Sequence, residues 1–210
     1  GVYYTPHQVA DFIVRAVDDL SREAFGLKDG IAAEEMKVLD FACGTGTFLK
    51  ATLERMLPKH HLTSVEVARW RGKILRDLYG FELLFTPYVI AHTLLGQTLQ
   101  EHGIILQQRD HLKVFLTNTL DLAQNAIPAS LPNLRREGEG AYLAKTATSI
   151  LSIIGNPPYF NGDSQENKCE FIDSLLADYK PKGERKTNLT DLYVKFFRFA
   201  DWKIATQGRG

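Results

Sequence analysis

The segment at residues 36–57, MKVLDFACGTGTFLKATLERML, constrains the fold more than any other part of the chain. It begins as a short apolar strand, passes through a glycine-containing turn and continues as a helix that Pro58 ends. Asp40 closes the strand, and Gly44 and Gly46 allow the backbone to approach a ligand closely just before the helix begins. We therefore expect a strand–turn–helix unit with a binding loop at its turn.

Three more apolar segments predict further strands, at residues 78–84, 112–116 and 150–154. Helices are expected near 67–78, at 88–101 and after the last strand. This alternation predicts an α/β fold with a doubly wound, mostly parallel, Rossmann-like sheet. Right-handed crossovers would place the strand ends, and the site, along one edge. The basic residues of the helix near 67–78 are expected on a solvated face: Arg69, Arg71, Lys73 and Arg76.

Two other segments are predicted from local signals. Thr5, Pro6 and Gln8 suit a helix start, with threonine as N-cap, proline in the first turn and glutamine completing a capping box. Thr86 and the proline after it repeat this signal before the helix at 88–101. Residues 121–148, rich in glycine, proline and charges, predict a surface insertion or loop.

Composition excludes several classes of protein. The 210 residues suit one domain, or one with appendages, and 25 basic against 25 acidic residues lack the excess of a self-sufficient nucleic-acid binder. Two distant cysteines argue against a disulfide framework, and six histidines without ligand spacing predict no metal. No apolar run approaches the about 18 residues that span a membrane. We expect a soluble, cytoplasmic protein with no membrane partner.

The loop at residues 40–46 favours an adenosine-like cofactor, but Leu49 stands where a dinucleotide fingerprint has its third glycine. A ribose needs a carboxylate at the end of the second strand, and Glu82 is the candidate. Glu66 is the alternative if TSVEV forms the strand. Asn118, after the third strand, could pair with an adenine edge or simply cap a turn.

The tetrapeptide Asn156-Pro157-Pro158-Tyr159 follows the fourth strand. The amino nitrogen of adenine is a weak nucleophile because its lone pair is delocalised into the ring. Two acceptors on its two hydrogens, the Asn156 side-chain oxygen and the Pro157 carbonyl, would localise that pair. Because a residue before proline is held extended, both acceptors are preorganised. Tyr159 offers a flat face for the base.

With these motifs in this order, the chain resembles the N6-adenine-specific DNA methyltransferases with the gamma arrangement of motifs, particularly the methyltransferase segment of large restriction-modification enzymes. The matching segments are YYTP (3–6), DFACGTG (40–46), GFE (80–82), TNTL (117–120), NPPY (156–159) and LYVKFFRFA (192–200). An aspartate is commoner in the family at the position of Asn118. The helix at 192–200 is expected beside the cofactor pocket.

The resemblance implies an S-adenosylmethionine-dependent methyltransferase fold that methylates adenine in double-stranded DNA after flipping the base out. It assigns Asn156, Pro157, Pro158 and Tyr159 to catalysis. It gives the cofactor Tyr4, Thr5, Pro6, Asp40, Ala42, Cys43, Gly44, Gly46, Glu82, Asn118, Thr119, Leu120 and Asn156. Cys43 receives no catalytic role, because a small side chain that packs well is enough there.

The resemblance also implies a division of the chain. Residues 1–35 would complete the cofactor pocket, and residues 36–210 would form the catalytic domain, cut before a target-recognition domain that carries most base readout. Four basic residues could meet DNA phosphates or form a solvated loop: Lys180, Lys182, Arg185 and Lys186. Two alternatives stay open, a protein-glutamine N5 methyltransferase, since that class also uses Asn-Pro-Pro-Tyr, and an inactive cofactor-binding module.

Overall fold

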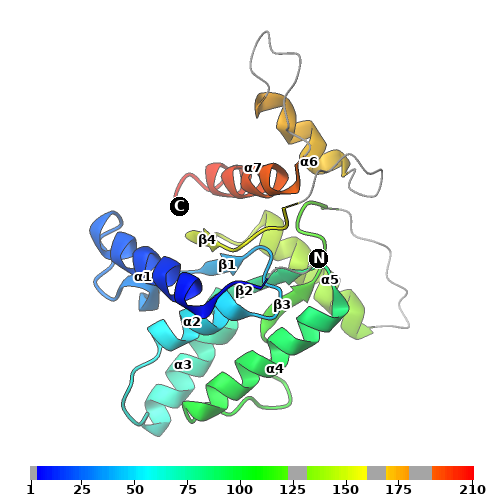
Figure 1. Cartoon of the computed structure of the whole chain (residues 1–210). Coiled ribbons are helices and arrows are strands. Elements are labelled where there is room, and N and C mark those ends of the chain that lie inside the picture. Colours follow the sequence, from blue (N-terminus) through cyan, green and yellow to red (C-terminus); the bar gives the residue numbers. More distant parts are fainter. Residues whose placement is uncertain (1–3, 123–131, 160–168, 180–190) are drawn as a thin grey trace.

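Four parallel strands form a sheet in the middle of the molecule (Figure 1). The computed structural model describes residues 4–122, 132–159, 169–179 and 191–210. In this part of the chain the strands follow the spatial order β3-β2-β1-β4, and every neighbouring pair is parallel. The strands are β1 Val38–Asp40, β2 Leu78–Glu82, β3 Lys113–Leu116 and β4 Ser152–Ile154.

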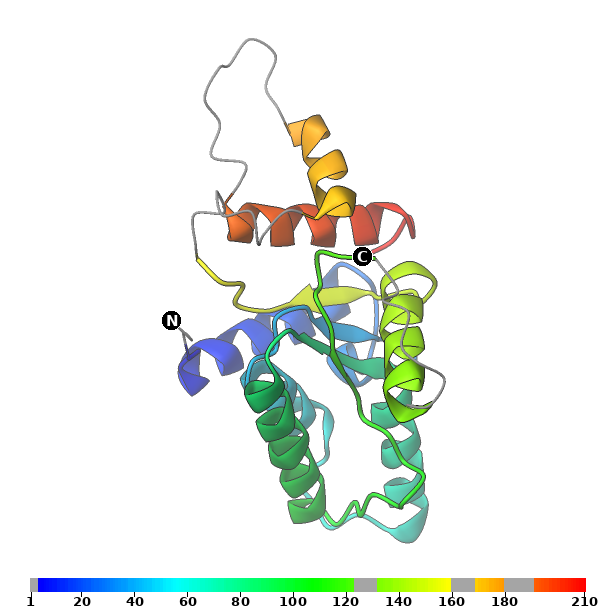
Figure 2. The same ribbon diagram turned by 90° about the vertical axis from the view of Figure 1, so that its right-hand side faces the viewer.

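Helices cover both faces of this sheet. One group packs on one face with the N-terminal helix, and the helices that follow β3 pack on the other, as Figures 1 and 2 show. The first group is α1 His7–Glu23, α2 Thr47–Met56, α3 Ser64–Asp77 and α4 Phe85–Glu101. The second is α5 Pro132–Thr146, α6 Glu170–Leu175 and α7 Leu192–Ala205, and short 3-10 turns lie at η1 Gly30–Ala32 and η3 Leu176–Tyr179.

Alternating side chains explain why both faces are covered. Val38 and Leu78 belong to the core cluster under α1 to α4, whereas Leu39 and Tyr79 belong to the cluster under α5 to α7. Successive residues of a strand point to opposite faces, so each strand contributes to both cores. A parallel sheet buried on both faces is typical of doubly wound proteins. The predicted α/β fold class is confirmed.

The strand order reverses at β1. From β1 the chain adds β2 and β3 on one side, and it then returns through α5 to place β4 on the other side of β1. In open α/β sheets, ligands bind at the carboxyl ends of the strands where this reversal occurs. The segments that follow β1 and β4 therefore lie where a site is expected.

The start of α1 differs from the sequence prediction. Pro6 is the N-cap residue, and no side chain caps the helix, so the capping box of Thr5 and Gln8 does not form. The Thr5 hydroxyl instead accepts a hydrogen bond from Asn156. Likewise α4 begins at Phe85 after the N-cap Leu84, so Thr86 lies inside the helix. At the start of α1, the long-range hydrogen bond between Asn156 and Thr5 takes the place of the predicted local capping box.

Part of the predicted insertion or loop at residues 121–148 is a helix in the structure, and residues 123–131 lie outside the described residues. Residues 132–146 form the regular helix α5, which packs against β3. A Cβ atom at Gly140 would lie 2.7 Å from the ring of Phe115, so this glycine permits close packing of helix on strand. Gly140 contributed to the loop prediction, but in the structure it allows α5 to pack closely on β3.

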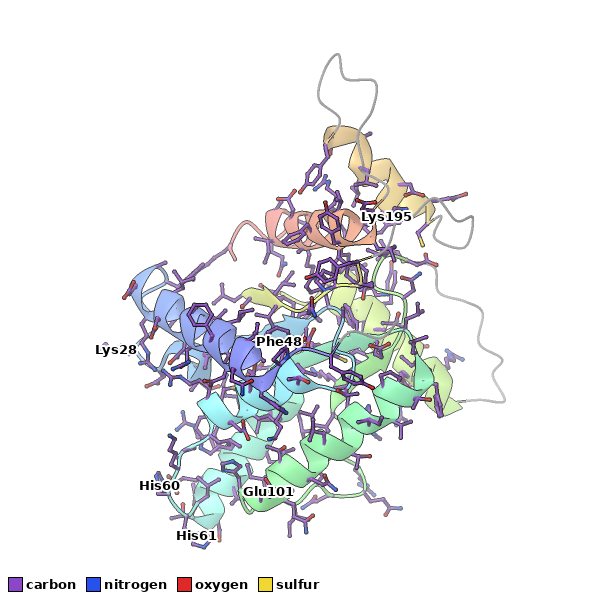
Figure 3. The ribbon with its side chains drawn as sticks, in the orientation of Figure 1. Lys28, Phe48, His60, His61, Glu101 and Lys195 are labelled. Atoms are coloured by element: carbon purple, nitrogen blue, oxygen red, sulfur yellow. The ribbon has the colours of Figure 1, made fainter. Side chains whose placement is uncertain are left out.

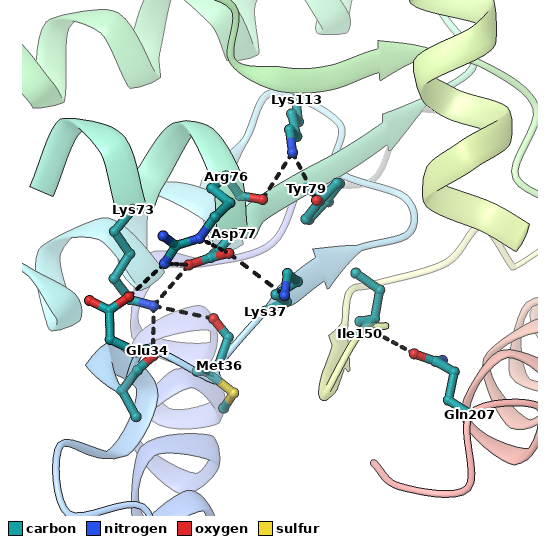
Figure 4. A network of polar contacts seen from close by, with 11 residues as sticks. Glu34, Met36, Lys37, Lys73, Arg76, Asp77, Tyr79, Lys113, Ile150 and Gln207 are labelled. Atoms are coloured by element: carbon teal, nitrogen blue, oxygen red, sulfur yellow. Dashed lines mark hydrogen bonds and ion pairs between the residues drawn. The ribbon is translucent and has the colours of Figure 1, made fainter. Parts of the chain in front are cut away.

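The position of Lys73 differs from the prediction of a solvated basic face. Its side chain is buried and donates to the carboxylate of Asp77 and to the carbonyl oxygen of Ala33, with Nζ–O distances of 3.1 and 2.6 Å (Figure 4). Arg76, by contrast, is half-exposed and pairs with Glu34. The basic face predicted to be solvated therefore has one buried member, because Asp77 and nearby carbonyl groups compensate its charge.

Among the helices that the structure describes, none combines the length and the apolar character that a membrane span requires.

Side chains of His60 and His61 lie at the tip of the connection between α2 and α3, on the side of the molecule away from Lys195 of α7 (Figure 3).

Candidate active site

Hydrogen bonds join the segments that follow the four strands. The amide of Phe41, after β1, donates to the carbonyl of Ile154 in β4 at 3.3 Å. The hydroxyl of Thr119, after β3, donates to the carbonyl of Phe41 at 2.6 Å, and the amide of Thr117 donates to the carbonyl of Glu82 at 2.7 Å. The carboxyl edge of the sheet is therefore one connected structure.

The loop after β1 makes the turn that its glycines predict. Gly44 and Gly46 have φ angles of 54° and 89°, a region that favours glycine, and Gly46 is the N-cap residue of α2. The Gly44 amide donates to Glu82 Oε2 at 2.9 Å, and the Leu84 amide donates to Glu82 Oε1 at 2.7 Å. Glu82 is thus held at the end of β2 beside the loop.

Glu66 lies in a different setting. The segment TSVEV begins helix α3, and Glu66 forms a capping box with Thr63 there. Backbone and side-chain hydrogen bonds from Thr63, with a smaller contribution from His60, lower the pKa of Glu66 to about 2. Because the alternative required this segment to be a strand, Glu82 is the strand-end glutamate.

Asp40 is completely buried at the end of β1. Its Oδ1 accepts a hydrogen bond from the Ala42 amide at 3.2 Å, and no group in the described part of the chain donates to Oδ2. Burial raises the pKa of Asp40 to about 8, and the charge of Glu82 adds to the effect. A buried oxygen without a donor is costly, so this position suits a ligand that brings a donor or a positive charge.

The tetrapeptide after β4 is connected to the N-terminal segment. Asn156 Nδ2 donates to Thr5 Oγ1 at 3.2 Å, and Asn156 Oδ1 accepts from the hydroxyl of Tyr159 at 2.8 Å. Tyr159 is 58% exposed, and its ring centroid lies 6.3 Å from that of Tyr193 in α7. Pro157 is buried and the next proline is exposed. The asparagine amide is therefore hydrogen-bonded at both ends, and an aromatic face is accessible beside it.

Gly155, which precedes the tetrapeptide, brings it close to β1. Its φ is 152°, and an added Cβ would lie 2.9 Å from Asp40 Oδ1 and 2.8 Å from the ring of Phe41. No larger residue fits at this position without a shift. Gly155 was not predicted from the sequence, because only this tertiary contact shows its importance.

Asn118 takes part in the turn after β3. Its Oδ1 accepts from the amide of Leu120 at 3.0 Å, and its Nδ2 donates to Cys169 Sγ at 3.5 Å. This arrangement is the turn cap considered above for Asn118. Thr119 and Leu120 are buried beneath it.

Cys43 packs inside the loop after β1. Its side chain is buried near Gly80 of β2, where an added Cβ would lie 3.2 Å from Cys43 Sγ and 2.8 Å from Leu49 Cδ1. Burial, with the nearby charges of Asp40 and Glu82, raises the pKa of the Cys43 thiol well above its usual value. The thiol is therefore protonated and serves packing, while Leu49 fills the space that Gly80 leaves.

The structure thus brings Thr5, Asp40, Gly44, Glu82 and Asn156 to one edge through direct contacts of their segments. Near the start of the described chain, Tyr4 and Pro6 are exposed. The four basic residues predicted to meet phosphates, Lys180, Lys182, Arg185 and Lys186, lie outside the described residues.

A groove of about 470 Å³ lies elsewhere, between α1, β4 and α7. Val17, Leu20, Leu151, Ile153 and Phe197 contribute to its largely apolar lining. None of the predicted site residues lines it, and Asp201 is the charged side chain in its otherwise largely apolar lining.

The family model described as N-6 DNA Methylase matches residues 1–195. The chain belongs to this family. A search of curated proteins finds no match. Similar solved structures include a cryo-EM complex of DrdV with DNA, 28% identical over 97% of this chain and 19% of that one, with a TM-score of 0.72.

Another similar structure is a nuclease-deletion mutant of the Type ISP restriction-modification enzyme LlaGI with a DNA substrate mimic, 25% identical over 96% of this chain and 17% of that one, with a TM-score of 0.74. The Type ISP enzyme LlaBIII, bound to DNA, shares the fold at 24% identity and a TM-score of 0.77, over 98% of this chain and 14% of that one. The chain spans about a fifth or less of the length of these proteins.

Proposed function

We propose that this member of the N-6 DNA methylase family is the catalytic segment of a restriction-modification enzyme, and that it transfers a methyl group from S-adenosylmethionine to N6 of adenine in DNA. The observation that carries the proposal is the position of Asn156-Pro157-Pro158-Tyr159. This tetrapeptide follows β4 at the edge where Asp40 and Glu82 end their strands. The likeness to DrdV in complex with DNA, and to a restriction-modification enzyme in complex with a DNA substrate mimic, supports DNA as the acceptor.

The residues at this edge fit the cofactor. Asp40 Oδ2 is buried and receives no hydrogen bond from the described residues, which suits the ammonium group of the methionine moiety. Each Glu82 oxygen accepts one backbone hydrogen bond and has a further lone pair for a ribose hydroxyl. Gly44 and Gly46 let the backbone pass close to the ligand. When bound, S-adenosylmethionine supplies a methyl group on a positively charged sulfur.

Asn156 and Pro157 would act on the target amino group. Asn156 Nδ2 is engaged by Thr5, which fixes the orientation of the amide and leaves Oδ1 to accept hydrogen bonds. Oδ1 already accepts from Tyr159, but a carbonyl oxygen can accept a second hydrogen bond. With the Pro157 carbonyl on the other amino hydrogen, the nitrogen lone pair is localised toward the methyl group.

Methyl transfer to N6 needs no strong general base. The cofactor would supply the methyl group: the bond from N6 to the methyl carbon would form as the bond from sulfur to that carbon breaks, with its electron pair left on sulfur. The extra proton on N6 then leaves to water. The target adenine must leave the duplex stack, and the exposed ring of Tyr159 offers a stacking face, an interaction of roughly 1–3 kcal/mol.

The proposal is tested with the parent polypeptide, labelled S-adenosylmethionine and unmethylated double-stranded DNA. After digestion to nucleosides, we expect the label on N6-methyladenosine. Label on cytosine alone would contradict the proposal. Label on a glutamine of a protein substrate, with none on DNA, would favour the alternative protein methyltransferase.

A further inference from the structure

Lys145 of α5 makes a compact set of contacts that the proposed chemistry does not use directly. Its side chain is only 3% exposed. Nζ donates to Thr117 Oγ1 at 2.8 Å, to the Asn118 carbonyl at 2.7 Å and to the Asp121 carbonyl at 2.8 Å. An ammonium group has three donors, and here all three go to one loop, residues 117–121 after β3.

This loop in turn contacts the two segments that carry the proposed cofactor carboxylates. Thr119 donates to the carbonyl of Phe41, the residue after Asp40. Thr117 donates through its amide to the carbonyl of Glu82. Two hydrogen bonds therefore separate the Lys145 ammonium from the backbone at each acidic residue.

Among the described residues, this loop and its surroundings compensate the burial of the ammonium. Nζ lies 5.4 Å from the ring centroid of Phe81, and the negative charge of Asp121 acts on it. Burial lowers the pKa of Lys145 to about 8. Loss of the ammonium would leave three loop oxygens without their donor, and buried polar groups that lose a partner drive local rearrangement.

We infer that Lys145 is a positioning residue for the cofactor site: it fixes loop 117–121 and thereby the backbone at Asp40 and Glu82. This inference rests on the proposed function, because it presumes that these two carboxylates bind S-adenosylmethionine. Lys145 itself is buried behind the loop and touches no substrate.

The test measures S-adenosylmethionine binding to the 210-residue chain by calorimetry, at a temperature where all variants are folded. Lys145→Met keeps the volume and removes the charge, and we expect the Kd to rise about 10- to 100-fold, since small misplacements in a site have effects of this size. Lys203→Met is the matched control. Lys203 is 1% exposed, burial lowers its pKa to about 8 as well, and it donates to the Thr148 carbonyl, outside loop 117–121.

The control variant should lose stability but keep its affinity for the cofactor. In a Lys145→Ala variant, added ethylammonium should partly restore affinity by occupying the vacated space, an effect that a merely structural role does not produce. If Lys145→Met does not fold, Thr117→Val decides, because it removes one of the three acceptors and should raise the Kd about 3- to 10-fold.

Wild-type affinity in both Lys145→Met and Thr117→Val, or in Thr117→Val alone if the former does not fold, would overturn the inference. Asp40→Asn and Glu82→Gln separate this failure from failure of the proposed function. If those two variants lose cofactor binding while the variants of Lys145 and Thr117 keep it, only the inference fails. If Asp40→Asn and Glu82→Gln bind normally, the cofactor assignment itself is wrong.

Discussion

Asp40 and Glu82 end neighbouring strands but have different hydrogen-bonding environments. Both oxygens of Glu82 accept backbone hydrogen bonds, whereas Asp40 has one acceptor engaged and one buried without a donor. The difference follows from burial, since the Asp40 side chain is completely buried, whereas Glu82 at the end of β2 is partly exposed. At the residue scale, Asp40 is the group whose state a bound cofactor would change most.

Asp40 predicts a pH dependence of stability. Its pKa is about 8 in the folded protein and 3.8 in the unfolded chain, so the folded state holds the proton more tightly. This contribution is complete below pH 3.8 and is lost as the pH rises through about 8. Between these values the free energy of unfolding should fall by up to about 1.4 kcal/mol per pH unit from this group.

Urea unfolding at several pH values from about 4.5 to about 8 measures this slope, and Asp40→Asn should flatten it because asparagine does not titrate. Identical slopes in the wild-type and variant proteins would show that Asp40 does not hold a proton in the folded state.

At the scale of elements, the strands were predictable and several helix details were not. The short apolar runs indicated β1 to β4, because strands buried on both faces are apolar throughout. The Thr5 signal was misread since its hydroxyl pairs with Asn156, and α5 was read as a loop since Gly140 packs on Phe115. Local sequence cannot show such contacts between distant segments.

The same limit applies to the candidate site. Asp40, Glu82 and Asn156 were recognisable because each follows a predicted strand, and parallel strands end at one edge. Lys145 and Gly155 carry no local signal, because their importance depends on a loop and a strand far away in the sequence.

Gly155 provides a prediction about how β4 and β1 fit together. Gly155→Ala would place a Cβ 2.8 Å from the Phe41 ring, in a backbone conformation that alanine rarely adopts. We expect the free energy of unfolding to fall by about 1–3 kcal/mol, measured by urea denaturation.

Gly72→Ala is the control for the substitution itself. Gly72 is exposed in α3, and nothing lies within 4 Å of its added Cβ, so alanine should stabilise the helix by about 0.5–1 kcal/mol. A neutral or stabilising effect of Gly155→Ala would mean that the close approach of these strands is not needed.

At the scale of the whole molecule, the chain combines a connected strand-end site with no net charge. Basic and acidic residues number 25 each, and the chain corresponds to about a fifth or less of the DNA-bound proteins that it resembles. Affinity for DNA depends mainly on neutralised phosphates, and sequence readout on contacts to base edges. We propose that other parts of a parent polypeptide supply most of the phosphate contacts and most of the sequence readout.

This distribution predicts that the 210-residue chain binds S-adenosylmethionine but binds DNA weakly and without sequence preference. Fluorescence anisotropy with labelled duplexes, read across a range of salt concentrations, measures the DNA affinity, and calorimetry measures the cofactor. Sequence-specific DNA binding with a Kd of about 10 nM or lower would contradict the prediction, because complete specific binders typically have a Kd between about 10 pM and 10 nM.

Asn156 is proposed to act on the target amino group, and the variant Asn156→Ala in the parent polypeptide separates this role from cofactor binding. Methyl transfer to adenine should fall by at least about 100-fold, as on removal of a preorganised hydrogen-bonding group, while the Kd for S-adenosylmethionine stays within about 3-fold of the wild-type value. Single-turnover transfer and calorimetry on the same preparation give both numbers. Equal loss of transfer and cofactor affinity, or transfer that persists at the wild-type rate, would show that Asn156 does not have this role.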